Sequence, residues 1–400
     1  MTVQLTFLAS GLVLLLTVLA CGGGSDPSPS PSAASPSQTM EPPVATGSLL
    51  TDYGVTDDEI RLGHVAGDGA LGQAIAAYFA YQNSEGGVCG RNITLLEGRS
   101  AAEAQALIEE DEVAAFAGNT TEPLIRQMID DAQVPELFAV TGDEPSAFPW
   151  SIAFGPGGVA EGAALAGYID ASFPDQTVGT LYQESELETR AAFVRATGAE
   201  VVAQESYAST QTDIDEQLDA IRAADPDVFV LFSSTEYTAL AYQYMTENDW
   251  HPQVVMSNGA DALELAEAVG GDVIAGAITA AYLADPLGDA PSVAEHTRIM
   301  AEYDGSPVSK DSLYAQAIAE TMIQTLDIAC EDGDMTRAGI LKAALEVEDF
   351  HPTTLLEGVN VMLGPSDQMA IETLLPVVIQ KDGTLAPFST EAPTPLPSAS

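Results

Sequence analysis

Residues 200–234 read EVVAQESYASTQTDIDEQLDAIRAADPDVFVLFSS, and they contain a strand, a helix and a second strand in succession. The two ends, 200–207 and 227–234, are short and rich in β-branched and aromatic residues, which favours strands. The middle, 213–226, has the pattern of an amphipathic helix, and its first acids, Asp213 and Asp215, favour a helix N-terminus. Short apolar strands that alternate with helices are typical of a parallel sheet in an α/β protein.

The same alternation runs through most of the 400 residues. We expect strands at 60–66, 92–98, 112–118, 136–142, 177–183, 200–207, 227–234, 253–259 and 273–283. Helices are expected at 71–87, 101–112, 121–133, 159–173, 187–198, 213–226, 236–249, 260–271, 312–330 and 336–349. The units fall into two similar blocks, 58–150 and 175–285, and the chain closes with a hairpin-like pair over 371–388. Two doubly wound lobes follow, since this length exceeds one ordinary domain.

The first twenty residues, MTVQLTFLASGLVLLLTVLA, are an apolar run that ends in small residues, as in an export signal. Residues 18–21 (VLAC) resemble the bacterial lipobox, which implies a signal peptide over 1–21 and a lipid on Cys21. A plain secretory signal with an incidental cysteine is the alternative. Residues 22–52 are rich in Gly, Ser and Pro and predict a disordered tether, and 391–400 predict a disordered tail.

The charge of the chain limits the classes of molecule that it can bind, and its cysteines limit the covalent links and metal sites that it can form. The chain has 12 Lys and Arg against 60 Asp and Glu, a formal net charge of -48, which repels phosphate backbones and excludes nucleic acid. Two cysteines, Cys89 and Cys330, remain after Cys21, and an exported protein meets conditions in which they can form a disulfide. Two free buried thiols are the alternative. Their spacing and the scattered histidines do not predict a metal site.

Several stretches occur in an order that is known from one family. They are VTDDEIRLG, NSEGGVCGRNITLLEG, EDEVAAFAG, VPELFAVTG, VGTLYQESE, the stretch from Glu205 to Ser234, and VSKDSLYAQAIAETM. Over residues 54–388 the chain resembles the substrate-binding proteins of branched-chain amino acid-type ABC transporters. The resemblance implies a type I periplasmic binding protein fold, with two Rossmann-like lobes joined by three crossovers. It places lobe I at 53–152 and 283–362, and lobe II at 153–282 and 363–390.

One candidate ligand-binding stretch lies in lobe I. Asn119, Thr120 and Thr121 follow a predicted strand and precede a predicted helix, where amides and hydroxyls can bind a carboxylate. The resemblance implies that this loop and Thr141-Gly142 together hold the α-carboxylate of an amino acid. A helix N-cap is the alternative role of Thr121.

The lobe II candidates lie where strands end. Ser233 and Ser234 end one predicted strand and Asn258 ends another, so parallel pairing brings them to one edge of the sheet. Amino acid binders of the resembled family have an acid near the position of Asn258, which contacts the ligand ammonium, and an aromatic residue near Ser234. This chain has neither, so amides, urea-like solutes, short carboxylates and aromatic acids stay open as ligands.

Three further residues complete the lobe II set. Glu186 stands where the family has a tyrosine and could offer a carboxylate to a cationic ligand; a solvated charge at a helix start is the alternative. Gln183 and Tyr282 could line the cleft or its hinge, and packing is the alternative for both.

A dinucleotide-dependent enzyme is a third hypothesis. Residues 67–72 (GDGALG) spell GxGxxG between a predicted strand and helix, and Glu97 ends the next strand. Against this, Asp68 would lie beside a pyrophosphate, and the chain lacks the short motifs of hydrolases, zinc proteases and P-loop enzymes.

We therefore expect a binding protein rather than an enzyme, with no cofactor and no metal. Its expected role is the extracytoplasmic, lipid-anchored component of an ABC importer that captures an amino acid or similar small polar solute in the interlobe cleft. The expected partners are that small-molecule ligand, ABC permease subunits, and the membrane through the lipid anchor. An extracellular ligand-sensing receptor domain without transport is the alternative.

Overall fold

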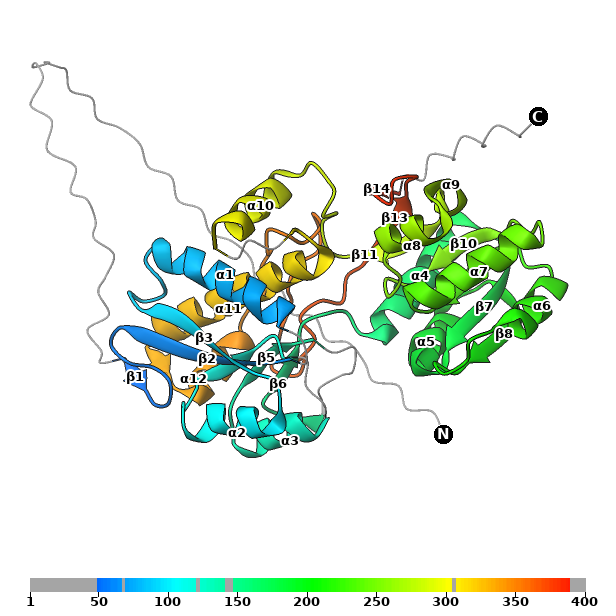
Figure 1. Ribbon diagram of the computed structural model, residues 1–400. Helices are drawn as coiled ribbons and strands as arrows, with labels where there is room; N and C mark the ends of the chain where they lie inside the picture. Colours follow the sequence, from blue (N-terminus) through cyan, green and yellow to red (C-terminus); the bar gives the residue numbers. More distant parts are fainter. Residues whose placement is uncertain (1–48, 67–68, 120–122, 141–146, 304–306, 389–400) are drawn as a thin grey trace, which may run out of the picture. The chain divides into compact units, whose positions relative to one another are not determined.

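The computed structural model describes residues 49–66, 69–119, 123–140, 147–303 and 307–388. Within them the chain builds two larger sheets, of five and seven strands, and each is covered by helices (Figure 1). A third sheet consists only of the parallel pair β1 (Leu50–Thr51) and β12 (Asp334–Met335). The two-sheet α/β fold class predicted from the sequence is confirmed.

The five-stranded sheet is parallel throughout and has the order β3-β2-β4-β5-β6. Its strands are β2 (Glu59–Val65), β3 (Asn92–Gly98), β4 (Ala115–Ala117), β5 (Glu136–Ala139) and β6 (Ser151–Ala153). The central strand β4 is buried on both faces, because Ala115 and Ala117 pack into one apolar cluster and Phe116 into another. Side chains of successive strand residues point to opposite faces, so helices are needed on both.

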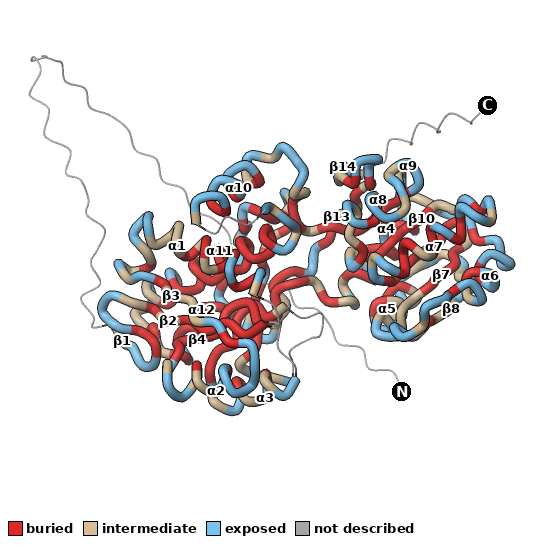
Figure 2. Tube along the Cα trace, in the orientation of Figure 1, coloured by how far each residue is buried: buried red, intermediate tan, exposed pale blue. Residues whose placement is uncertain are grey.

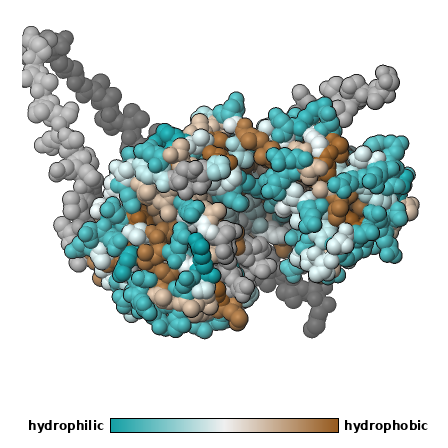
Figure 3. Space-filling model, viewed as in Figure 1, coloured by the Kyte–Doolittle hydropathy of each residue, from teal (hydrophilic) through white to brown (hydrophobic). Residues whose placement is uncertain are grey.

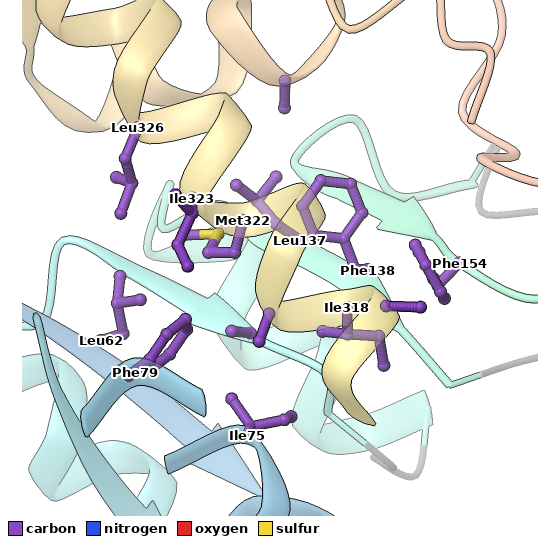
Figure 4. Close-up of a cluster of buried hydrophobic side chains, with 14 of the residues drawn as sticks. Leu62, Ile75, Phe79, Leu137, Phe138, Phe154, Ile318, Met322, Ile323 and Leu326 are labelled. Atoms are coloured by element: carbon purple, nitrogen blue, oxygen red, sulfur yellow. The ribbon is translucent and has the colours of Figure 1, made fainter. Parts of the chain in front are cut away.

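Two groups of helices meet this need. The helices α1 (Ala70–Ser84), α10 (Pro291–Tyr303), α11 (Lys310–Glu331) and α12 (Arg337–Ala344) supply the first cluster, and α2 (Ala101–Glu109) and α3 (Pro123–Asp131) supply the second. Figure 4 shows the first cluster: Phe79 of α1 and Met322 of α11 point toward Leu62 of β2 and Leu137 of β5. The helical stretch near 291–344 therefore belongs to the core of the five-stranded sheet.

The seven-stranded sheet has the order β14-β13-β11-β10-β9-β7-β8. Five strands run parallel: β7 (Thr177–Gln183), β8 (Glu200–Tyr207), β9 (Val228–Phe232), β10 (Gln253–Met256) and β11 (Ile278–Ala281). The last two, β13 (Leu375–Ile379) and β14 (Leu385–Pro387), pair antiparallel, so the hairpin expected over 371–388 is confirmed. The strand expected over 273–283 is wrong at its start, where the short helix α9 (Gly271–Ile274) precedes β11.

The helices of this sheet also divide between its faces. Val228, Val230 and Phe232 of β9 pack with α4 (Gly158–Ser172) and α5 (Leu187–Ala196). Phe229 and Leu231 face the cluster of α6 (Asp215–Ala223), α7 (Thr235–Glu247) and α8 (Ala262–Val269). In Figure 2 the central strands of both sheets are coloured mainly as buried. The carboxyl ends of the parallel strands form the edge at which open α/β sheets bind ligands.

The disulfide between Cys89 and Cys330 joins the turn after α1 to the last turn of α11, and its Cα atoms are 6.4 Å apart. The bridge lies in the helical layer of the five-stranded sheet. Cys21 lies outside the described residues, as do the expected signal peptide, most of the tether and the tail. The lobe boundaries drawn from the resemblance stay a prediction.

Hydrophilic residues cover a large part of the face seen in Figure 3, interrupted by smaller apolar areas. This matches a chain with 60 acidic residues. In the described part of the chain, every helix is too short or too polar to cross a bilayer.

Candidate functional site

The carboxyl ends of β7, β9 and β10 lie side by side, because these strands are parallel neighbours in the seven-stranded sheet. Gln183 is the last residue of β7, Ser233 directly follows β9, and Ser257 directly follows β10. The sheet therefore gathers polar residues from three separate stretches of sequence at one edge.

A cavity of about 1030 Å³ opens at this edge. Five residues predicted from the sequence line it: Gln183, Glu186, Ser233, Ser234 and Asn258. The N-terminal turn of α4 and the chain around residues 366–372 complete the wall. The volume lies at the upper end of the ~300–1,000 Å³ that is typical of ligand pockets, so the cavity is large enough for a small organic solute.

Glu161 is the least exposed charged side chain of this wall, with 7% of its surface accessible. It lies in the first turn of α4, and its Oε1 accepts a hydrogen bond from the backbone amide of Asn258 at 2.6 Å. The pKa of Glu161 is raised to about 7, chiefly by burial and to a smaller extent by the charge of the nearby Glu186. The hydrogen bond from Asn258 and the charge of Lys310 act in the opposite direction. The carboxyl group is therefore poised to change charge near neutral pH.

Asn258 is tied down through its backbone on both sides. Its amide donates to Glu161, and its carbonyl oxygen accepts from Nζ of Lys310, the first residue of α11, at 2.8 Å. Among the described residues, none is hydrogen-bonded to the carboxamide of Asn258, which lines the cavity. The backbone thus fixes the loop, and the side chain stays available to a ligand.

The two serines at the end of β9 differ in what they offer. The hydroxyl of Ser233 is buried and pairs with Oγ1 of Thr238 at 2.9 Å, so it stabilises the start of α7. Ser234 is exposed and is the N-cap residue of α7, but its hydroxyl makes no capping bond. An unused hydroxyl and helix amides beside a cavity can donate hydrogen bonds to a polar solute.

Gln183 and Glu186 lie at the β7 side of the cavity. The Gln183 amide donates to Oγ of Ser185 at 2.9 Å, and Oε2 of Glu186 accepts from Oγ1 of Thr189 at 2.9 Å. Glu186 ends the short 3₁₀ turn Glu184–Glu186, immediately before α5. Its carboxylate keeps one oxygen for a further partner.

Of the predicted lobe I residues, the structure describes Asn119. Asn119 is fully buried: its Oδ1 accepts from the amide of Val65 at 2.8 Å, and its Nδ2 donates to Oε1 of Glu136 at 3.1 Å. Its side chain therefore links β2 to β5. Thr120, Thr121, Thr141 and Gly142 lie outside the described residues.

Tyr282 does not line the large cavity. It contributes to a neighbouring cavity of about 600 Å³, together with Asn258, Lys310 and Tyr314. The rings of Tyr282 and Tyr314 meet edge to face with centroids 6.2 Å apart. Both tyrosines are packing partners and border a polar opening.

The GxGxxG stretch has a packing role in its described part. A Cβ on Gly72 would lie 2.6 Å from Cδ2 of His64 and 3.3 Å from Oε1 of Glu97. Gly72 thus allows α1 to approach β2 closely, while Gly67 and Asp68 lie outside the described residues. Within the described residues, no group of three or more His, Cys, Asp or Glu is arranged to hold a metal ion.

Glu161 was missed by the sequence reasoning, although a signal was present. From Gly158 to Ile169, the helix GVAEGAALAGYIDAS contains mainly small and apolar residues, with Glu161 as the one charged residue. Glu161, Leu165 and Ile169 share one face at a spacing of four. Leu165 and Ile169 are buried. An acid on the buried face of a helix is uncommon without a function or partner, and helical periodicity alone points to it.

Comparison with known proteins identifies relatives of this fold. Residues 63–384 match the family described as periplasmic binding protein. A branched-chain amino acid ABC transporter protein from Thermus thermophilus with bound valine is similar over 84% of this chain and 96% of its own, with 15% identity and a TM-score of 0.69. A fatty acid ABC transporter substrate-binding protein from Thermomonospora curvata is similar over 85% and 94%, with 18% identity and a TM-score of 0.67.

A branched-chain amino acid transporter substrate-binding protein from Streptococcus pneumoniae, in complex with isoleucine, is similar over 82% of this chain and 98% of its own. Its identity is 15% and its TM-score 0.66. At these identities the likeness establishes the fold, and the structures differ in the ligands named for them. A search of curated protein sequences finds no match.

Proposed function

Because the chain belongs to the periplasmic binding protein family, we propose that it is the extracytoplasmic solute-binding component of an ABC importer, with an amino acid or similar small polar solute as its ligand. The similar structures are substrate-binding proteins and receptors rather than enzymes. The cavity at the carboxyl edge of the seven-stranded sheet carries the proposal, because it collects polar residues from several strand ends.

In this proposal the ligand binds against the strand ends of lobe II and is enclosed when lobe I closes over it. A protein with open and closed forms shifts to the closed form when the ligand contacts both lobes. The permease then recognises the closed form. Asn258 supports this role because its carboxamide is available and its backbone is held by Glu161 and Lys310.

A thermal-shift screen of small solutes on the exported protein tests ligand capture. A ligand that binds only the folded form raises the melting temperature. Asn258→Ala should lower the affinity for a solute found in the screen about tenfold, because the hydrogen bonds of the Asn258 side chain are lost. Asn360→Ala, outside the cavity lining, serves as the matched control. If N258A responds like the wild type, the site assignment is wrong.

Uptake measurements separate transport from sensing. Cells that lack the chain should lose uptake of the solute found in the screen, and the wild-type gene should restore it while the gene for N258A should not. Unchanged uptake in the deletion strain would contradict the importer role and favour a receptor domain without transport.

Membrane attachment through Cys21 belongs to the same proposal. It is supported by the lipobox-like residues 18–21 and by the Gly-, Ser- and Pro-rich stretch that follows. A single lipid chain gives only weak, reversible binding, and stable anchoring needs a second chain or signal. Cys21→Ser should release the protein from the membrane fraction into the soluble fraction. Equal distribution of wild type and C21S would refute the anchor.

A further inference from the structure

The cavity at the edge of the seven-stranded sheet has a one-sided charge. Its wall contains five acidic residues: Glu161, Glu186, Glu188, Asp367 and Glu372. Among the described residues that line it, none is Lys or Arg. In a chain of net charge -48, exposed acids by themselves identify no ligand. Glu161 differs from the other four acids of this wall because it is almost completely buried.

Glu161 is buried with only part of its hydrogen-bonding capacity used. An ionised carboxylate can accept about four hydrogen bonds. Oε1 accepts one, from the amide of Asn258, and no described group is hydrogen-bonded to Oε2. A buried polar group without partners is unfavourable unless a ligand or water completes it. The free oxygen belongs to a side chain that forms the wall of a solute-sized cavity.

Holding the Asn258 loop does not require a charge. A glutamine at position 161 would present the same acceptor oxygen to the Asn258 amide, and it would avoid most of the desolvation penalty of a buried carboxylate. The structural role of Glu161 therefore does not explain why position 161 carries an ionisable carboxyl group. Glu186 lies close enough to Glu161 to raise its pKa, and both residues line the cavity.

We propose that this cavity selects solutes of net positive charge, amines or guanidines, whose cationic group pairs with Glu161 and is supported by Glu186. The proposal rests on the solute-binding function proposed above and names the class of its ligand. Charge-assisted hydrogen bonds from an ammonium or guanidinium group would satisfy Oε2 and neutralise the buried charge. Solutes without an ammonium or guanidinium group would leave it unpaired, and zwitterionic or anionic solutes would bring a carboxylate to a wall that is already acidic.

Proton release on binding is a consequence of this geometry. Since burial raises the pKa of Glu161 to about 7, much of the free protein carries a protonated Glu161 at pH 6, and a bound cation favours the ionised form. The groups that act on Glu161 are Glu186 at the start of α5, Lys310 at the start of α11 and the hydroxyl of Tyr282 beside β11. Affinity for a cation should consequently rise between pH 5.5 and pH 8.

The test is calorimetric titration of the exported protein with a fixed panel at pH 8. The cationic probes are arginine, lysine, agmatine and putrescine, and the others are leucine, glutamine, glutamate and succinate. At least one cationic probe should bind, and Glu161→Gln should lower the affinity for that probe about tenfold or more. Glu188→Gln removes the same charge from an exposed position in the same wall. This variant should lower the affinity for the probe less than about threefold.

The outcomes are separable. Binding of the cationic probe at pH 6 in two buffers of different ionisation enthalpy should release up to about one proton, and E161Q should abolish the release. If only neutral or anionic probes bind, or if E161Q and E188Q behave alike, the cation proposal fails while solute binding stands. If none of the four cationic probes binds, the proposal is likewise overturned. A chain that responds to no solute in the wider thermal-shift screen would overturn the proposed function itself.

Discussion

Glu161→Gln should change how the stability of the unliganded protein depends on pH. As the pH rises from 5 to 8, the free energy of unfolding of the variant should increase relative to that of the wild type. The pKa of Glu161 is raised from 4.5 to about 7 in the folded protein, chiefly by burial. A folded-state pKa above the unfolded value means that stability is fully present below pH 4.5 and is lost as pH rises through 7. With one pKa unit equal to about 1.4 kcal/mol, the wild type should lose about 2.5 kcal/mol between pH 5 and pH 8 through this group.

The glutamine variant keeps the acceptor for the Asn258 amide and does not titrate. The contributions of all other acids to the pH dependence of stability are the same in both proteins, so they cancel in the comparison. Urea unfolding at pH 5, 6, 7 and 8 gives the free energy of unfolding of each protein. The difference between them should change by about 2.5 kcal/mol in favour of E161Q toward pH 8. A difference that is constant across this range would refute the assignment of Glu161 as a buried, titrating carboxyl group.

Three further changes test the five-stranded sheet and its helices. Replacing Cys89 and Cys330 together by serine should lower the free energy of unfolding by about 5 kcal/mol, because the bridge closes a loop of 241 residues, and the loss should match that caused by reducing the wild type. Arg126→Met should cost about 3–5 kcal/mol in urea unfolding, since it leaves Glu136 buried without its 3.0 Å ion pair, and adding E136Q should recover part of the loss. Gly72→Ala should cost about 1–3 kcal/mol, because its Cβ would lie 2.6 Å from an imidazole carbon, and an unchanged melting curve would exclude this close packing.

Strand ends predicted from periodicity located much of the cavity wall. Gln183, Ser233, Ser234 and Asn258 come together because parallel neighbours end at the same edge, and this follows once the strands are recognised. The same reasoning was insufficient for Asn119. It also follows a strand, yet its carboxamide turns inward to Val65 and Glu136. Position at a strand end limits where a residue lies, whereas the direction of its side chain depends on the partners that packing provides.

Local sequence patterns predict the alternation of strands and helices, the division into two sheets and the closing hairpin. They do so because hydrophobic periodicity and turn residues act over a few positions along the chain. The contact between Glu161 and Asn258 joins residues 97 positions apart. Nothing local relates α4 to the loop after β10. Only the packing of α4 against the seven-stranded sheet brings a carboxylate beneath that loop, and burial there is the chief cause of its raised pKa. The charge character of the cavity is thus a property of the folded chain, since it depends on distance and desolvation that no linear pattern encodes.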